Sequence, residues 1–201
     1  MNNIEVKKLY FSPVKSFNFI EKDSLKIIKD IGIEHDRIFS LVRNKTKDEA
    51  IKFQNKQYLR NNQSYLSVKN TPILNLYQVS YDNYFLKIFK NQKEIISTSH
   101  FNFDNLQNVS LKIKEHELSL KDKEIYFLYN PKIPFYDMIN DHVLSLINLE
   151  SLRDFEIRSG MSIDHERFRA NIVLNSFLEF KYENFIQNIY FNYFIFNKRY
   201  S

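Results

Sequence analysis

Three short polar segments adjoin predicted strands and carry side chains that can bind phosphate. The first follows a strand at 10–14, the second leads into a strand at 37–42, and the third opens a strand at 167–174. Guanidinium groups bind phosphate through paired hydrogen bonds, and lysine adds a point charge. Taken singly, each segment is better explained as a solvated turn or a structural ion pair than as a phosphate-binding site. If the three strand ends meet, they form an anion site whose candidate side chains are Lys15, Ser16, Arg37, Arg167, Arg169 and Asn171.

The rest of the sequence excludes several kinds of active site. With Cys 0, the chain has no disulfide, no thiolate nucleophile and no cysteine-ligated metal. Its only glycines, Gly32 and Gly160, are too few for a nucleotide-binding loop, and no Gly-x-Ser-x-Gly or His-Glu-x-x-His pattern occurs. Two groups of acids and histidines have the chemistry to bind a hard cation, but such groups are common near loops, and we predict no metal site. They are Asp137, Asp141 and His142, and Asp164, His165 and Glu166.

The composition is that of a folded protein with a mildly basic surface. The 201 residues are 43% hydrophobic and 16% aromatic, more than disordered chains contain. Lys and Arg number 29 against 24 for Asp and Glu, a formal charge of +5, and the two signs are interspersed. No run of about 18 apolar residues is present to span a membrane, and the first residues lack the apolar run of a signal peptide. We therefore expect a cytoplasmic protein.

Short strands separated by polar turns dominate the pattern and favour an all-β or α+β fold. One helix is predicted from local chemistry, because Asn148 is a good N-cap and Gly160 is placed to end the helix. Two prolines between 130 and 137 mark a loose domain boundary. The expected strands are 10–14, 24–28, 37–42, 64–68, 74–79, 84–89, 110–113, 142–147 and 167–174, with a hairpin at 188–196.

Together, the three polar segments resemble the MOSC family, named for the C-terminal domain of molybdenum-cofactor sulfurase. Residues 10–16, Tyr-Phe-Ser-Pro-Val-Lys-Ser, look like the Tyr-Pro-Val-Lys-Ser signature of the MOSC N-terminal domain. Residues 32–37, Gly-Ile-Glu-His-Asp-Arg, look like its Gly-Leu-x-x-Asp-Arg element. Residues 141–171, ending in Arg-Phe-Arg-Ala-Asn, are similar to the MOSC domain itself. The resemblance spans about residues 9–174, although its middle adds little beyond length and strand content.

The resemblance implies a chain that is mainly β with a few helices, an α+β fold. A β-barrel-like MOSC N-terminal domain would occupy residues 1–130, and an incomplete MOSC β-barrel domain would occupy residues 131–201. It also implies a molybdenum cofactor (molybdopterin) held between the domains, and a family-level association with pyridoxal phosphate. The cofactor-binding residues would be Lys15, Ser16, Arg37, Arg169 and Asn171, with Arg167 as the weaker match.

The resemblance also implies a reaction class. Better-known members reduce N-hydroxylated compounds with electrons from a separate redox protein, and others serve sulfur transfer. Catalytic relatives ligate molybdenum through a cysteine, which this chain lacks. We therefore expect a chain without turnover, as a fragment that stops before the family cysteine or, as the alternative, a non-catalytic remnant. The least favoured alternative is a basic β-domain that stacks on single-stranded nucleic acid.

Overall fold

The computed structural model describes residues 4–136, 144–176 and 195–197. The chain divides into two compact units. Unit 1 combines residues 1–11, 21–34 and 142–201, and unit 2 combines residues 12–20 and 35–141. Because the chain passes repeatedly between the units, each is assembled from distant parts of the sequence. The expected division into family domains at 1–130 and 131–201 stays a prediction.

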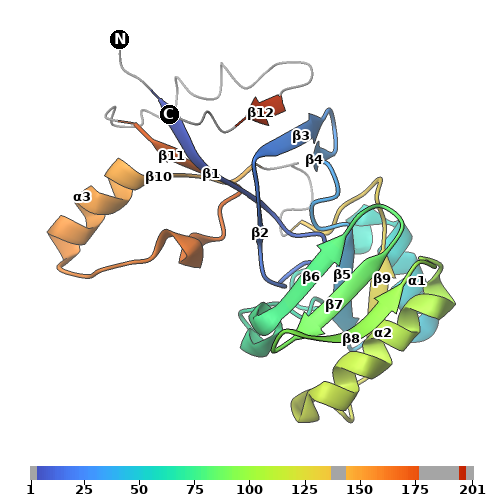
Figure 1. Cartoon of the computed structure of the whole chain (residues 1–201). Helices are drawn as coiled ribbons and strands as arrows, with labels where there is room; N and C mark the ends of the chain where they lie inside the picture. The colour runs from blue at the N-terminus through green and yellow to red at the C-terminus, as the bar shows by residue number, and fades with distance from the viewer. Residues whose placement is uncertain (1–3, 137–143, 177–194, 198–201) are drawn as a thin grey trace. The chain divides into compact units, whose positions relative to one another are not determined.

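Unit 1 contains a sheet with the strand order β10-β11-β1-β2 (Figure 1). Strand β1 (Glu5–Phe11) pairs antiparallel with β11 (Ile172–Asn175), and an irregularity interrupts the register near the start of β1. Strand β10 (Leu146–Asn148) runs parallel to β11, and β2 (Ile20–Lys22) forms the other edge. The N-terminal strand therefore lies between β2, which follows it closely along the chain, and β11, which is far away in sequence.

A second sheet of unit 1 has the order β12-β3-β4. It contains β3 (Ser24–Ile28), β4 (Gly32–Ile33) and β12 (Ile195–Asn197). The expected strand at 24–28 is confirmed. The turn between β3 and β4 needs left-handed backbone, which Asp30 (φ 63°) and Gly32 (φ 102°) supply.

The predicted helix is confirmed as α3 (Leu149–Ser159). The Asn148 side chain accepts a hydrogen bond from the Glu150 N–H (3.3 Å), which satisfies one of the open donors of the first turn. Gly160, at φ 69°, ends the helix in the left-handed conformation that a side chain would disfavour. After α3, the short 3₁₀ turn η4 (His165–Phe168) leads into β11.

Unit 2 contains two further sheets. Strand β5 (Phe39–Arg43) pairs antiparallel with β9 (Ile125–Tyr129). Strands β6 (Tyr77–Tyr81), β7 (Leu86–Lys90) and β8 (Lys93–Thr98) form an antiparallel three-stranded sheet. The expected strands at 37–42 and 84–89 correspond to β5 and β7, each displaced by one or two residues.

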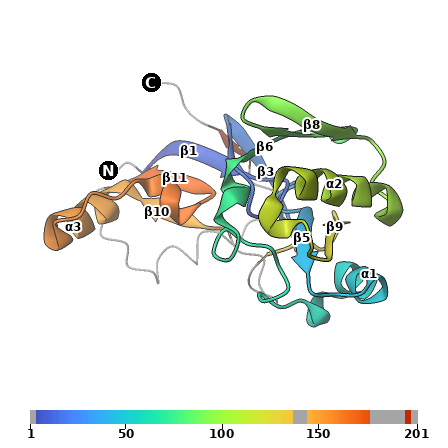
Figure 2. The ribbon, with the colours of Figure 1, turned by 90° about the horizontal axis from the view of Figure 1, so that it is seen from below.

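Two helices cover the strands of unit 2. Helix α1 (Lys47–Asn55) begins with a capping box between Thr46 and Glu49, and α2 (Phe103–His116) packs against β8 and β9 (Figure 2). Shorter 3₁₀ turns are η1 (Gln57–Leu59), η2 (Pro72–Leu76) and η3 (Leu118–Leu120). Phe39 lies at the centre of the core, with ring centroids of four aromatic side chains within 5.6 Å: Tyr81, Phe101, Phe127 and Tyr129.

Several predicted strands were wrong. Residues 110–113 lie inside α2, whose buried side chains at 106, 109, 110 and 113 follow helical spacing. Residues 64–68 form only an isolated bridge between Tyr65 and Val42. Residues 74–79 begin as η2 and become β6 only at Tyr77. Each of these four- to six-residue segments was too short for its pattern to distinguish a strand from part of a helix.

The described residues form a mixed α+β structure, with three α-helices and four open sheets. None of these sheets closes into a barrel within residues 4–136, 144–176 and 195–197. The expected hairpin at 188–196 lies mostly outside the described residues. Among the helices that are described, none combines the length and the apolar character needed to cross a membrane.

Candidate functional site

Residues 12–16 and 35–39 of unit 2 lie side by side and join two of the three predicted polar segments; we call them the paired segments. The Arg37 N–H donates to the Ser12 carbonyl (2.7 Å). Further along, the Lys15 N–H donates to the Phe39 carbonyl (2.8 Å). These hydrogen bonds fix the two backbones against each other, so residues that are far apart in sequence lie on neighbouring segments.

Asp36 connects the paired segments through its side chain. The residue is fully buried, its Oδ1 accepts from the Ser12 N–H (2.8 Å), and its Oδ2 accepts from Nη1 of Arg37. The Ser12 hydroxyl in turn donates to the Val14 carbonyl (2.8 Å). A buried carboxylate is stable here because both oxygens accept hydrogen bonds and one of them faces a cation.

The Arg37 guanidinium is held by charge and by aromatic rings. Beyond the ion pair with Asp36, its Cζ lies 5.4 Å from the ring centroid of Phe19 and 5.6 Å from that of Tyr136. Cations are attracted to the faces of aromatic rings at such distances. Burial raises the pKa of the Tyr136 phenol, the Asp36 charge raises it further, and Arg37 opposes that effect. Tyr136 is therefore neutral at physiological pH.

Lys15 and Ser16 complete the polar groups of the paired segments. Lys15 is only 3% exposed, and its Nζ lies 4.6 Å from the ring centroid of Tyr65. Ser16 is also buried and adopts a left-handed backbone, with φ 73°. A lysine buried this far is uncommon in proteins unless it is paired. The paired segments thus combine two cations, one carboxylate and two hydroxyls in a largely buried setting.

Left-handed backbone coincides with the predicted site. Asn, Asp and His tolerate positive φ best among the non-glycine residues. Outside those types and glycine, only four described residues adopt it, and three of them were predicted from sequence as cofactor-binding residues. The four are Ser16, Arg37, Arg169 and Gln92. Such conformations cost about 1–3 kcal/mol and cluster at functional sites.

The third polar segment belongs to unit 1 and surrounds η4. Asp164 begins this turn by accepting a hydrogen bond from the Glu166 N–H (2.9 Å), and Arg169 ends it at φ 50°. Arg167 is exposed, whereas Arg169 is half-buried. The structure therefore gives the third segment an ordered turn, and its role toward a cofactor stays a prediction.

Asn171 performs a structural task in unit 1. It is 1% exposed, its Oδ1 accepts from the Ser145 hydroxyl (2.8 Å), and its Nδ2 donates to the Tyr10 carbonyl (3.1 Å). These bonds connect the start of β11 with β1 and with the residue before β10. Because the amide already serves two neighbours, its first role is to join strands, and the predicted cofactor contact stays a prediction.

Within the described part of the chain, no group of three or more His, Cys, Asp or Glu side chains is arranged to hold a metal ion. Asp164, His165 and Glu166 are described and do not form such a group. The group Asp137, Asp141 and His142 lies outside the described residues. An open depression of about 350 Å³ beside α2 has mainly neutral lining residues, namely Ile96, Ser97, Thr98, His100, Asn105 and Asn108.

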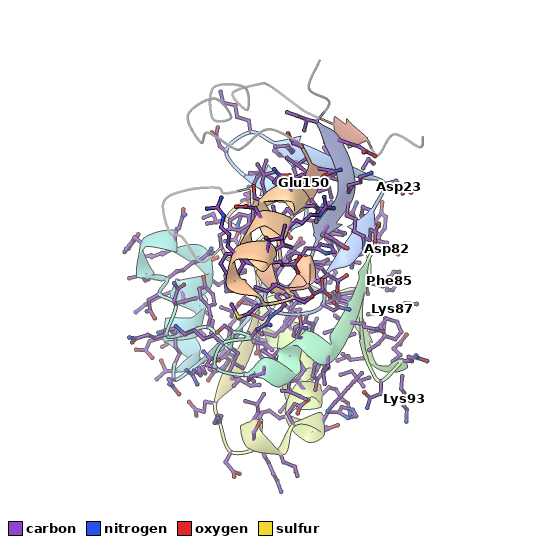
Figure 3. All side chains as sticks on the ribbon, turned by 90° about the vertical axis from the view of Figure 1, so that its left-hand side faces the viewer. Asp23, Asp82, Phe85, Lys87, Lys93 and Glu150 are labelled. Atoms are coloured by element: carbon purple, nitrogen blue, oxygen red, sulfur yellow. The ribbon has the colours of Figure 1, made fainter. Side chains whose placement is uncertain are left out.

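The outer side of the three-stranded sheet carries charges of both signs (Figure 3). Lys87, Lys93 and Asp82 are exposed. Glu94, on β8, is exposed as well. Phe85 is 47% exposed beside them. A groove for single-stranded nucleic acid needs a basic track along its aromatic side chains. On these strands acids interrupt the lysines, so this surface gives no support to nucleic-acid binding.

Sequence reasoning missed part of the surroundings of Arg37. Phe19 and Tyr136 were not singled out, and Asp36 was quoted only as part of a motif. Tyr136 lies about 100 residues from Arg37 in sequence, and no local pattern connects the two positions. Backbone pairing brings that segment alongside: the Phe135 N–H donates to the Arg37 carbonyl (2.8 Å), and the Asn130 N–H donates to the Ile38 carbonyl (2.9 Å).

Comparison with known proteins gives no assignment. No model of a known protein family matches the chain, and no curated protein matches it either. The MOSC resemblance therefore depends on residues 10–16, 32–37 and 141–171 alone and stays a prediction.

Proposed function

We propose that this chain is a MOSC-type protein that binds the phosphate of a pterin-based molybdenum cofactor. The observation that carries the proposal is the Arg37 guanidinium, which is held in place by a buried carboxylate on one of the paired segments. Ser16 and Lys15 lie on the other segment, as the family signature implies. Two separately predicted motifs therefore supply neighbouring groups of the type that a phosphate needs.

The residues fit one part of the cofactor and lack another. Arg37 and Lys15 provide the positive charge for its phosphate, and the Ser16 hydroxyl can donate a hydrogen bond. No cysteine is present in the sequence to ligate molybdenum. When bound in the proposed family, such a cofactor supplies the metal centre for reduction of N–O bonds. In this chain, the residues would bind and orient the anionic end without turning over a substrate.

The finer structural assignment is part of the same proposal. The open α+β sheets would represent a β-barrel-like MOSC N-terminal domain followed by an incomplete MOSC domain. The resemblance also assigns Arg167, Arg169 and Asn171 to cofactor binding, and that assignment belongs to the same proposal. A separate redox protein and an N-hydroxylated substrate would be the partners of a complete enzyme. The ordered turn around η4, with its left-handed Arg169, supports a specific role for that segment.

Cofactor retention tests the proposal. The full chain is expressed in cells that make molybdopterin, purified, and denatured under oxidising conditions that convert the pterin to a fluorescent product. We expect a pterin signal from the wild type and at least a tenfold smaller one from Arg37→Lys, because lysine lacks the forked donors. Arg158→Lys is the matched control, since Arg158 is exposed and pairs with exposed Asp154. Absence of pterin from the wild type would favour the non-catalytic remnant.

A further inference from the structure

Two mostly buried arginines of unit 2 use their guanidinium groups differently. Arg60 donates from Nε, Nη1 and Nη2 to the carbonyls of Phe53, Gln54, Ile133 and Pro134, at 2.7–3.1 Å. Within the described part of the chain, the Arg37 guanidinium donates from Nη1 alone, to Asp36. Among the described residues, Nε and Nη2 of Arg37 have no hydrogen-bond partner. Arg60 is therefore a structural connector, whereas Arg37 keeps one edge of its guanidinium available.

The available edge of Arg37 is held in a defined orientation. Asp36 fixes Nη1, and its other oxygen is anchored by the Ser12 N–H at 2.8 Å. The rings of Phe19 and Tyr136 lie within 5.6 Å of the guanidinium carbon. The Arg37 side chain is 16% exposed, against 1% for Asp36. A ligand can therefore reach Arg37 while the carboxylate stays covered.

We propose that Asp36 is a positioning residue that aims the Nε and Nη2 edge of Arg37 at a phosphate group. The forked N–H groups of that edge match two oxygens of a phosphate monoester or pyrophosphate. The proposal rests on the proposed function, because it assigns to Asp36 the orientation of the same anion-binding arginine. Preorganisation of this kind strengthens binding because less conformational freedom is lost when the ligand arrives.

The sign of one measurement separates positioning from simple electrostatics. Asp36 is negative and adjoins the proposed anion site, so removing its charge alone would strengthen phosphate binding. Loss of orientation would weaken binding. Asp36→Asn keeps the shape and an oxygen for the Ser12 N–H but cannot pair with the cation. If Asp36→Asn makes the site more positive and still binds phosphate more weakly, Asp36 acts by positioning Arg37.

The experiment is a calorimetric titration of the purified full chain with inorganic pyrophosphate, repeated with acetate. We expect the wild type to bind pyrophosphate more tightly than acetate. Asp36→Asn and Arg37→Lys should each raise the Kd for pyrophosphate about tenfold. Arg158→Lys, in unit 1, should leave the Kd within twofold. Unchanged or tighter binding by Asp36→Asn would overturn the proposal, as would wild-type binding that does not depend on Arg37.

A spectroscopic measurement keeps the proposal testable if Asp36→Asn folds poorly. In the wild type the Arg37 Nε–H should give a distinct NMR signal, because its guanidinium is held and lies near two aromatic rings. Phe19→Leu keeps apolar volume but removes one ring; it should shift that signal and raise the Kd for pyrophosphate about threefold. No change in either quantity would contradict the proposed positioning.

The two proposals can fail separately. If pyrophosphate binding follows the expected pattern but the purified chain carries no pterin, the cofactor assignment fails and the positioning role of Asp36 stands. If the chain carries pterin but Asp36→Asn binds pyrophosphate as well as the wild type, the positioning role fails and the cofactor assignment stands.

Discussion

The paired segments of unit 2 and the η4 segment of unit 1 each place an aspartate just before an arginine-bearing turn, but they use it differently. Asp36 is fully buried and pairs with a largely buried Arg37. Asp164 is 64% exposed and caps a short turn in front of Arg167, which is also exposed. Both segments contain an arginine in left-handed conformation. Similar sequence chemistry has therefore produced a covered ion pair in one unit and an accessible turn in the other.

Burial decides how strongly such an aspartate contributes to stability. A buried charge that loses its partner remains without water to replace it, so the free-energy cost is several kcal/mol. An exposed carboxylate that caps a turn is exchanged for water at little cost. The following predictions test this contrast, beginning with the largest effect.

Removal of the Asp36 carboxylate should have the largest effect on stability. Asp36→Ala leaves a mostly buried guanidinium and the Ser12 N–H without their partner, and we expect a loss of about 3 kcal/mol in the free energy of unfolding. Asp164→Ala should cost about 1 kcal/mol or less, as the loss of a cap does. Hydrogen exchange of backbone amides in β5 and in β11 reports each change in its own unit. Equal losses of unfolding free energy in the two variants would show that burial does not decide the effect of these aspartates.

The stability of unit 1 should depend on the neutral side-chain amide of Asn171, as the stability of unit 2 depends on the charged Asp36. Asn171→Ala removes the bonds to Ser145 and to the Tyr10 carbonyl, and we expect unit 1 to lose about 2 kcal/mol, measured from exchange of the β1 and β11 amides. Asn105→Ala, at an exposed position on α2, should change stability by less than about 0.5 kcal/mol. A negligible effect of Asn171→Ala would show that its contacts are dispensable.

Alkaline pH should destabilise unit 2 through its buried tyrosines. Burial raises the pKa of Tyr77, Tyr81 and Tyr136 above the ordinary value of 10.0. Above about pH 10 the unfolded chain loses these protons while the folded unit keeps them, so stability falls as pH rises, by up to about 1.4 kcal/mol per pH unit for each tyrosine. Tyr81→Phe should make the fall of the β5–β9 amide protection less steep. An equal slope in wild type and variant would refute this cause.

The smallest expected effects concern left-handed backbone. Gln92→Gly relieves positive φ in the exposed β7–β8 turn and should stabilise the protein by about 1 kcal/mol. Ser16→Gly relieves the same strain in a buried position but removes packed atoms, so we expect a gain of about 0.5 kcal/mol. Thermal unfolding followed by far-UV circular dichroism measures both. Pyrophosphate binding should weaken in Ser16→Gly and stay unchanged in Gln92→Gly. If Ser16→Gly binds pyrophosphate as tightly as the wild type, the backbone strain at Ser16 has no role in the binding site.

Local chemistry predicted some elements of the fold well. The helix α3 follows from Asn148 and Gly160, and β3 from its alternating pattern, because caps, turns and short-range alternation depend on neighbouring residues. Helix α2 was missed and part of it was assigned to a strand, since residues 110–113 were considered without the preceding turns. Four residues are too few to distinguish the spacing of apolar side chains in a strand from that in a helix.

The candidate site was predictable only as a set of residue types. The sequence supplied Lys15, Ser16 and Arg37 as cationic and hydroxyl groups beside strands. It could not supply Tyr136 or the role of Asp36, because their contacts with Arg37 depend on backbone pairing between distant segments. Asn171 was predicted as a ligand, but its two hydrogen bonds show a role in joining strands that no motif contains.

Composition and local sequence patterns set which chemistry is available to this protein. It excludes thiolates and glycine-rich loops, and it provides cations and hydroxyls at strand ends together with the caps and turns that neighbouring residues specify. Tertiary structure alone decided which arginine is covered, which carboxylate holds it, and which of its N–H groups remain open. Those outcomes depend on burial and on hydrogen bonds between segments far apart along the chain, and neither property belongs to any short stretch of residues.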